Sequence, residues 1–282
     1  MASLQKTRER IKVVNNIKII TNAVQLVAAS KIKQAQKTIE NFNKYYNLFS
    51  NIFNDLMNDI EKKDIESLWK DNKNPNTLYI IITSDLGLSG SYNSNIFRLA
   101  DENIKVDDKM YIFGKKGIMR WNTEKYRSMI IGKAFNLGDK IDYKEANKVA
   151  NTAIEMFKNK KIGAIKIIYT EYINSLTYIE NIKQILPFEI KEKQNTKNQM
   201  SLVEFEPNPF QILLTSIPMY LGCEIQRCLN ISKLSEISSR RFTMENATKN
   251  ADELANNLKL QYNRERQTKI TQEITEIISG SE

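Results

Sequence analysis

Apolar and polar residues alternate with a helical period at both ends of the chain. Residues 2–65 contain no glycine or proline, and residues 212–278 contain only Pro218 and Gly222, both near the start of that stretch. In the first stretch the apolar positions recur mostly three, four or seven residues apart, as one face of a helix requires: Leu4, Ile11, Val14, Ile17, Val24, Val27, Ala28, Ile32 and Ala35. The sequence therefore predicts a long amphipathic helix at each end.

The C-terminal stretch also contains a heptad pattern, which is typical of a helix that packs on a partner helix. Its seam is predicted to be Met244, Ala247, Ala251, Leu254 and Leu258. A helix of this length would extend roughly 100 Å, more than a globular core needs. Because long helices are stabilised mainly by packing, we expect the two terminal helices to form an antiparallel coiled coil.

The middle of the chain has a different pattern, and seven of the nine glycines lie within residues 87–163. Strand-like apolar runs occupy residues 78–83, 110–113, 129–131 and 164–170, with helical segments between them, notably 143–157. This alternation predicts a parallel, Rossmann-like α/β domain inserted between the helices. Residues 176–188 should be a further extended stretch, and the polar residues 191–199 should be mobile.

The expected fold class is thus α/β, a coiled coil with an inserted α/β domain. The predicted domains are an N-terminal shaft helix (1–70), a central α/β foot domain (76–206) and a C-terminal shaft helix (209–282) that pairs with the first.

Composition and charge narrow the class of protein. With 41% hydrophobic and 27% charged residues the chain is typical of a soluble protein, and no apolar run approaches the roughly 20 residues of a membrane span. No signal or transit peptide is recognised before the first helix. The net charge of the chain is +9, and much of it lies in the first 37 residues, which contain eight Lys and Arg residues and one Glu. Such a basic face suits nucleic acid, a lipid surface or acidic protein loops.

The chain offers few residues for catalysis. It has no histidine, which excludes Ser-His-Asp and Cys-His arrangements and any His-ligated metal. Neither the GxxxxGK(S/T) phosphate-binding loop nor the GxGxxG dinucleotide-binding motif is present. Cys223 and Cys228 are predicted to be buried thiols. Ser89 lies in a glycine-rich turn at residues 83–91 and could be considered as a hydrolase nucleophile, but the sequence offers no base to activate it. We expect no catalytic, cofactor-binding or metal-binding residues, and a structural role for this turn.

Three separated segments, in order, carry a resemblance. Residues 18–31 read KIITNAVQLVAASK, residues 84–90 read SDLGLSG, and residues 270–280 read ITQEITEIISG. Each is similar to a motif of the γ subunits of rotary F-type ATP synthases, and the resemblance spans essentially the whole chain. It departs from the family pattern at Val24, Leu86, Ser89 and Ser91.

The resemblance implies a non-catalytic rotor whose helices turn inside a ring of α and β subunits and couple ion flow to conformational change at the ring's catalytic sites. Further implied partners are an ε-type subunit and a membrane rotor ring, with no nucleic acid and no cofactor. The implied location is the cytoplasmic side of the cell membrane, as a peripheral protein. A rotor of a specialised F-type-like ATPase and, more remotely, a basic coiled-coil nucleic-acid-binding protein are the alternatives.

The same resemblance assigns contacts to particular residues. Arg266 and Gln267 match residues that hydrogen-bond a β-subunit loop. An apolar tip seated in the ring is implied for Ile270, Ile274, Ile277 and Ile278. Contacts with acidic β-subunit loops are implied for Lys18, Lys31 and Lys33.

Overall fold

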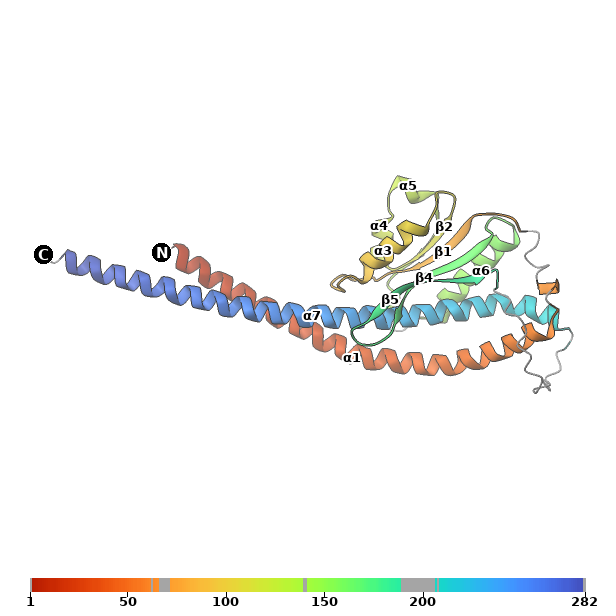
Figure 1. The fold of residues 1–282 in the computed structure, drawn as a ribbon, viewed down its shortest axis with the longest axis horizontal. Coiled ribbons are helices and arrows are strands. Elements are labelled where there is room, and N and C mark those ends of the chain that lie inside the picture. Colours follow the sequence, from red (N-terminus) through yellow and green to blue (C-terminus); the bar gives the residue numbers. More distant parts are fainter. Residues whose placement is uncertain are drawn as a thin grey trace. The chain divides into compact units, whose positions relative to one another are not determined.

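The computed structural model describes residues 2–61, 63–65, 72–138, 141–188, 206 and 208–280. Two long helices and a five-stranded sheet dominate this part of the chain (Figure 1). The helices are α1 (Ala2–Asp59), α3 (Tyr92–Asn103), α4 (Lys115–Arg120), α5 (Glu124–Arg127), α6 (Tyr143–Lys158) and α7 (Pro209–Ser279). The strands are β1 (Thr77–Ile82), β2 (Lys109–Phe113), β3 (Ile130–Ala134), β4 (Ala164–Tyr172) and β5 (Tyr178–Leu186).

The chain divides into two compact units. Unit 1 comprises Met1–Ser30 and Arg240–Glu282, and unit 2 comprises Lys31–Ser239. The division therefore falls within α1 and α7 rather than at their inner ends, so each long helix contributes a segment to both units. The sheet and the shorter helices belong to unit 2 alone.

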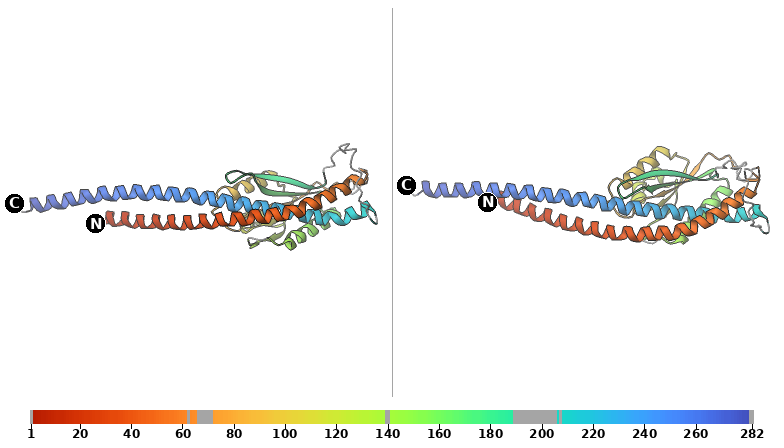
Figure 2. Two further views of the ribbon diagram at one scale, coloured as in Figure 1. Left: turned by 90° about the horizontal axis from the view of Figure 1, so that it is seen from below. Right: turned by 60° about the horizontal axis from the view of Figure 1, so that its bottom comes forward.

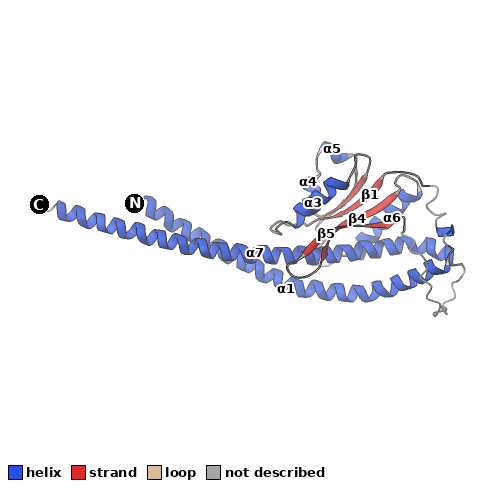
Figure 3. Cartoon of the chain, in the orientation of Figure 1, coloured by secondary structure: helices blue, strands red, loops and turns tan. Residues whose placement is uncertain are grey.

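The sheet of unit 2 has the strand order β3-β2-β1-β4-β5. Its strands are drawn in red in Figure 3. The first four strands are parallel, and Ile80 at the centre of β1 lies opposite Tyr111 of β2 and Ile167 of β4. All six residues of β1 are buried, as expected for a central strand covered on both faces. The parallel α/β sheet predicted from the sequence is confirmed for these four strands.

The fifth strand was predicted only as an extended stretch. It pairs antiparallel with β4 through a hairpin, with Tyr172 opposite Tyr178. It forms the edge of the sheet. Residues 191–199, predicted to be mobile, lie outside the described residues.

Helices cover both faces of the sheet and give unit 2 three layers (Figure 1). On one face, Ile80 and Ile167 belong to a buried apolar cluster with Leu56 of α1, Val149 of α6 and Leu229 of α7. The opposite face is covered by α3 and the end of α4. Its buried cluster includes Ile81, Ile112, Ile96 and Trp121. These two clusters form the core of unit 2.

The long helices follow the predicted pattern except at the end of the first helix. The first ends at Asp59, whereas the N-terminal shaft helix was predicted to extend to residue 70. The second contains Pro218, which removes one backbone donor. Buried Ile217, Leu221 and Ile225 on either side of Pro218 anchor this part of α7 in the core. Among the described residues, no helix combines the length and apolar character needed to cross a membrane.

Candidate functional surface of the helix pair

In unit 1 the two helices are antiparallel, because the residue numbers of contacting pairs run in opposite directions. Thr21 contacts Thr248, and Lys18 contacts Asp252. Within unit 1 the N-terminal part of α1 runs beside α7 in each view of Figures 1 and 2. The expected antiparallel packing of the terminal helices is confirmed within this unit.

The seam between the helices combines small and polar residues with a few larger apolar residues. On α1 the inward positions step by three and four residues, and Thr7, Thr21 and Ala28 are buried there. On α7 they include Met244, Thr248, Ala251, Ala255 and Leu258. Alanine and threonine allow the backbones to approach closely, but they bury little apolar surface.

Polar contacts join the helices across this seam. Thr248 Oγ1 donates to Thr21 Oγ1 at 2.7 Å, and Thr21 Oγ1 donates to the Lys18 carbonyl at 3.1 Å. Lys18 Nζ lies 2.5 Å from Asp252 Oδ1, with both side chains about half exposed. Directional contacts of this kind fix the register of two helices.

The predicted seam contains two residues, Ala247 and Leu254, that lie off the observed seam. Leu254 is 46% exposed, whereas its neighbour Ala255 is 1% exposed. Starting from Met244 the seam steps by four, three, four and three, so it passes through Thr248 and Ala255 rather than Ala247 and Leu254. Ala247 is half-buried at its margin. The prediction chose Leu254 because leucine is the more apolar residue, but the narrow seam holds the smaller side chain of Ala255.

A second stripe of apolar residues faces outward from α1 in unit 1. Val13, Ile17, Ile20 and Val27, here called the apolar band, are exposed by 47–61%. Ile17 and Val27 were predicted to lie on the packed stripe, whereas Val13 and Ile20 were not predicted to have a role. The four residues of the apolar band are spaced by four, three and seven positions. This helical period in the sequence could have revealed a second apolar stripe beside the seam. Contiguous exposed apolar residues mark interaction sites.

The C-terminal end of α7 presents a further exposed apolar surface. Figure 2 shows α7 continuing past the start of α1 within unit 1, and every residue from 270 to 280 is exposed. The apolar tip expected from the resemblance lies on this segment: Ile270, Ile274, Ile277 and Ile278. Arg266 and Gln267 are exposed just before it, where a partner could reach their side chains.

The three lysines implied to meet acidic loops are divided between the two units. Lys18 belongs to unit 1 and is bonded to Asp252 of its own chain, whereas Lys31 and Lys33 belong to unit 2. Lys33 is exposed and Lys31 is half-buried. An exposed ion pair contributes only about 0–1 kcal/mol, so the Lys18–Asp252 pair does not prevent Lys18 from binding a partner.

The glycine-rich turn of unit 2 is closed by its own hydrogen bonds. Ser84 N donates to Asn93 Oδ1 at 3.1 Å, and Lys115 N donates to Asp85 Oδ1 at 3.0 Å. Ser89 is 2% exposed, and its carbonyl accepts a bond from Ser239 Oγ at 2.6 Å. A buried hydroxyl beside the Asn93 amide is not positioned as a nucleophile. The turn has the structural role expected from the sequence.

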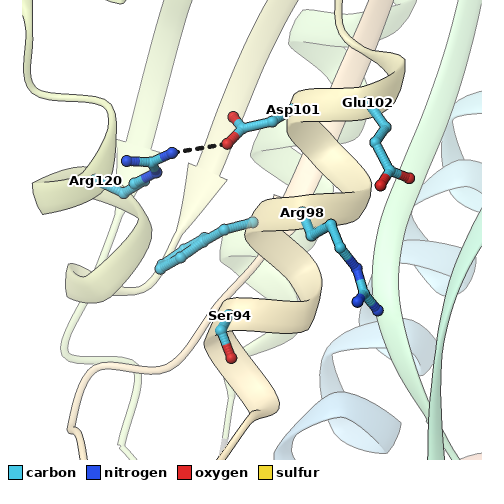
Figure 4. A pocket seen from close by; sticks show the side chains of 6 residues that line it. Ser94, Arg98, Asp101, Glu102 and Arg120 are labelled. Atoms are coloured by element: carbon cyan, nitrogen blue, oxygen red, sulfur yellow. Dashed lines mark hydrogen bonds and ion pairs between the residues drawn. The ribbon is translucent and has the colours of Figure 1, made fainter.

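A surface depression of about 530 Å³ lies between α3 and α4 (Figure 4). Arg120 points across it to Asp101, with 2.8 Å between Nη2 and Oδ2. Arg98 points the other way and pairs with Glu180 of β5 at 3.1 Å. Both arginines of the depression are thus paired with carboxylates of the same chain.

The two cysteine thiols, the remaining candidates for reactive groups, are buried. Cys223 and Cys228 are free buried thiols, as predicted. Burial is the main cause that raises the pKa of Cys228, to about 12, and it also raises the pKa of Cys223. Both thiols therefore stay protonated at neutral pH. Within the described residues, no group of His, Cys, Asp and Glu side chains could hold a metal ion.

Comparison with known proteins identifies similar chains across the full length. A family model described as ATP synthase matches residues 3–282. The chain is 41% identical over 281 residues to the ATP synthase gamma chain of Mycoplasmopsis pulmonis, covering 100% of this chain and 99% of that one. It is 37% identical over 286 residues to the gamma chain of Clostridium kluyveri, covering 100% of this chain and 98% of that one.

Solved structures share the fold. The rotor of the Euglena gracilis mitochondrial ATP synthase in rotational state 1 matches with a TM-score of 0.71 and 16% identity, over 95% of this chain and 99% of that one. A chain of the OSCP/F1/c-ring structure of the same enzyme in rotational state 3 matches with a TM-score of 0.70 and 17% identity, over 99% and 93% of the two chains. At such identities the likeness concerns the fold alone.

Proposed function

This chain belongs to the ATP synthase gamma chain family, and we propose that it is the central rotor of a rotary ATP synthase. In this role α1 and α7 turn inside a ring of α and β subunits. The observation that carries the proposal is the exposed apolar surface of unit 1, the apolar band and the apolar tip, which an isolated protein would not need.

The coupling proposed for the rotor is a difference in binding free energy. A helix pair with one apolar face presents different surfaces to the subunits around it. Each surrounding subunit would then be biased toward a different conformation, and rotation would exchange these conformations in turn. The chain itself supplies no catalytic group in this proposal, and ATP chemistry belongs to the ring.

Particular residues are proposed to make the contacts. The apolar tip would sit in the ring, and Arg266 and Gln267 would hydrogen-bond a β-subunit loop. Lys31 and Lys33 would meet acidic loops, together with Lys18 when its bond to Asp252 opens. An ε-type subunit and a membrane rotor ring would complete the complex on the cytoplasmic side of the cell membrane.

The test is co-purification of a tagged full-length chain with its partners. We expect α- and β-type ATPase subunits in the recovered complex, ATP hydrolysis by that complex, and none by the chain alone. Recovery of the chain without such subunits would contradict the proposal. A hydrolysing complex that lacks a membrane ring would instead identify the rotor of a specialised F-type-like ATPase.

A matched pair of variants tests the surface that carries the proposal. Ile20→Asp places a charge in the apolar band, whereas Asn22→Asp adds the same charge at an exposed polar position two residues away. Ile20→Asp should lower the yield of ring subunits without changing the melting temperature of the chain, and Asn22→Asp should leave both unchanged. Equal yields for the two variants would show that the band is not the contact surface.

A further inference from the structure

A buried carboxylate lies where three elements of unit 2 meet. The side chain of Glu224 on α7 is 0% exposed, and Lys183 Nζ of β5 lies 2.7 Å from its Oε2. Tyr46 Oη of α1 donates a hydrogen bond to the other oxygen, Oε1. One carboxylate therefore connects both long helices to the edge strand of the sheet.

The surrounding side chains complete the network. Tyr220, one helical turn before Glu224, also hydrogen-bonds to it, and burial together with the negative charge raises the pKa of Tyr220. The same causes raise the pKa of Tyr46, so its hydroxyl stays a neutral donor. The Arg227 guanidinium lies 5.2 Å from the centre of the Tyr46 ring. This is a second contact between α7 and α1 at the same level.

Stability alone gives little reason for this arrangement. A buried ion pair loses hydration on both partners, and well-packed apolar residues of similar volume often stabilise a fold as much or more. Apolar packing is available nearby, since the rings of Phe53 and Tyr220 stack with 4.3 Å between centroids. Apolar contacts are not directional. Hydrogen bonds and ion pairs define an angle, and they resist rotation of one element about another.

We propose that Glu224, Tyr46 and Lys183 form the joint that transmits torque between the sheet of unit 2 and the helix segments of α1 and α7 packed on it. The proposal rests on the rotor function proposed above. A rotor that receives force on its sheet domain must pass it to the helices without slipping. The three residues act as positioning residues, because they hold α1 and β5 at fixed angles around α7.

The experiment measures angular stiffness in the assembled complex. A bead is attached to unit 2 through Val106→Cys, at a residue 77% exposed and far more accessible than the two buried native thiols. Angular fluctuations of the bead are recorded while the ring is held by a non-hydrolysable ATP analogue. Tyr46→Phe removes only the hydroxyl, and Lys183→Met removes the charge and the N–H donors but keeps an unbranched side chain. Tyr45→Phe, one residue away, is the control, because the Tyr45 hydroxyl contacts the Cys223 thiol and not the Glu224 carboxylate.

We expect Tyr46→Phe and Lys183→Met each to broaden the angular variance, by at most about twofold, because each removes one of the directional bonds to Glu224. Tyr45→Phe should match the wild type, and Lys183→Arg should restore most of the stiffness. A lower melting temperature with unchanged variance would overturn the proposal, because the network would then be purely structural. If Lys183→Met does not fold, Tyr46→Phe decides alone.

This outcome is separable from that of the rotor proposal. A wild-type complex that does not rotate with ATP would contradict the rotor function itself. A wild-type complex that rotates, with Tyr46→Phe indistinguishable from it in variance, would contradict only the joint.

Discussion

Threonine and alanine occupy positions in unit 1 that most coiled coils give to leucine. Thr21 and Thr248 form a hydrogen bond across the seam. The small side chains of Ala28, Ala251 and Ala255 let the two helices approach closely. A polar residue in a seam selects one register at some cost in stability. The pairing of Thr21 with Thr248 therefore favours a defined alignment of the helices over maximal strength.

The register can be tested with two neighbouring substitutions in the full-length chain. Ala255→Asp buries an unpaired charge and should lower the free energy of unfolding by at least about 2 kcal/mol. Leu254→Asp places the same charge at a 46% exposed position and should change it by about 0.5 kcal/mol or less. Urea unfolding followed by helical circular dichroism measures both, and a larger effect of Leu254→Asp would restore the register expected from the sequence.

At the scale of elements, local signals predicted most of the sheet. The apolar runs located β1, β2 and β4 to within about two residues, because a central parallel strand is a continuous apolar segment bounded by polar residues. The direction of β5 was not predictable in this way. Its residues alternate in burial, and only pairing with β4 determines that it runs antiparallel.

Glycine at the end of β2 is required by the backbone. Gly114 has φ +94°, and a Cβ there would lie 2.2 Å from the Thr83 carbonyl oxygen. Gly138 also has positive φ, +70°, but nothing lies within 4 Å of its Cβ position. Gly114→Ala should therefore cost about 3 kcal/mol of unfolding free energy and Gly138→Ala about 1 kcal/mol. Thermal denaturation checks the order, and equal losses would mean that the contact with Thr83 relaxes freely.

At the scale of the whole molecule, sequence reasoning found the two terminal helices and the inserted domain, but it did not find the boundary between the compact units. That boundary lies within both helices, at Ser30 and Ser239. Helical periodicity continues across it and gives no signal. Likewise, the bonds of Lys18 to Asp252 and of Tyr46 to Glu224 join residues more than 170 positions apart, so no local pattern could reveal them.

The two units should differ in local stability. Unit 1 has a narrow seam of small and polar residues, whereas unit 2 has two buried apolar clusters. In the isolated chain, amide hydrogens of residues 2–30 and 240–280 should exchange faster than those of β1, β2 and β4. Hydrogen exchange followed by mass spectrometry measures this, and equal protection of both regions would show that the units open together.

The pairing of Thr21 with Thr248 has a consequence for synthesis of the chain on the ribosome. The first helix to emerge must wait for its partner, which is translated last. At about 5–20 residues per second, the roughly 210 residues between them take on the order of ten to forty seconds. Throughout that interval the seam of residues 2–30 has no partner, and the apolar band beside it is equally uncovered. We therefore expect chaperones that bind exposed apolar helices to bind the nascent chain until translation ends.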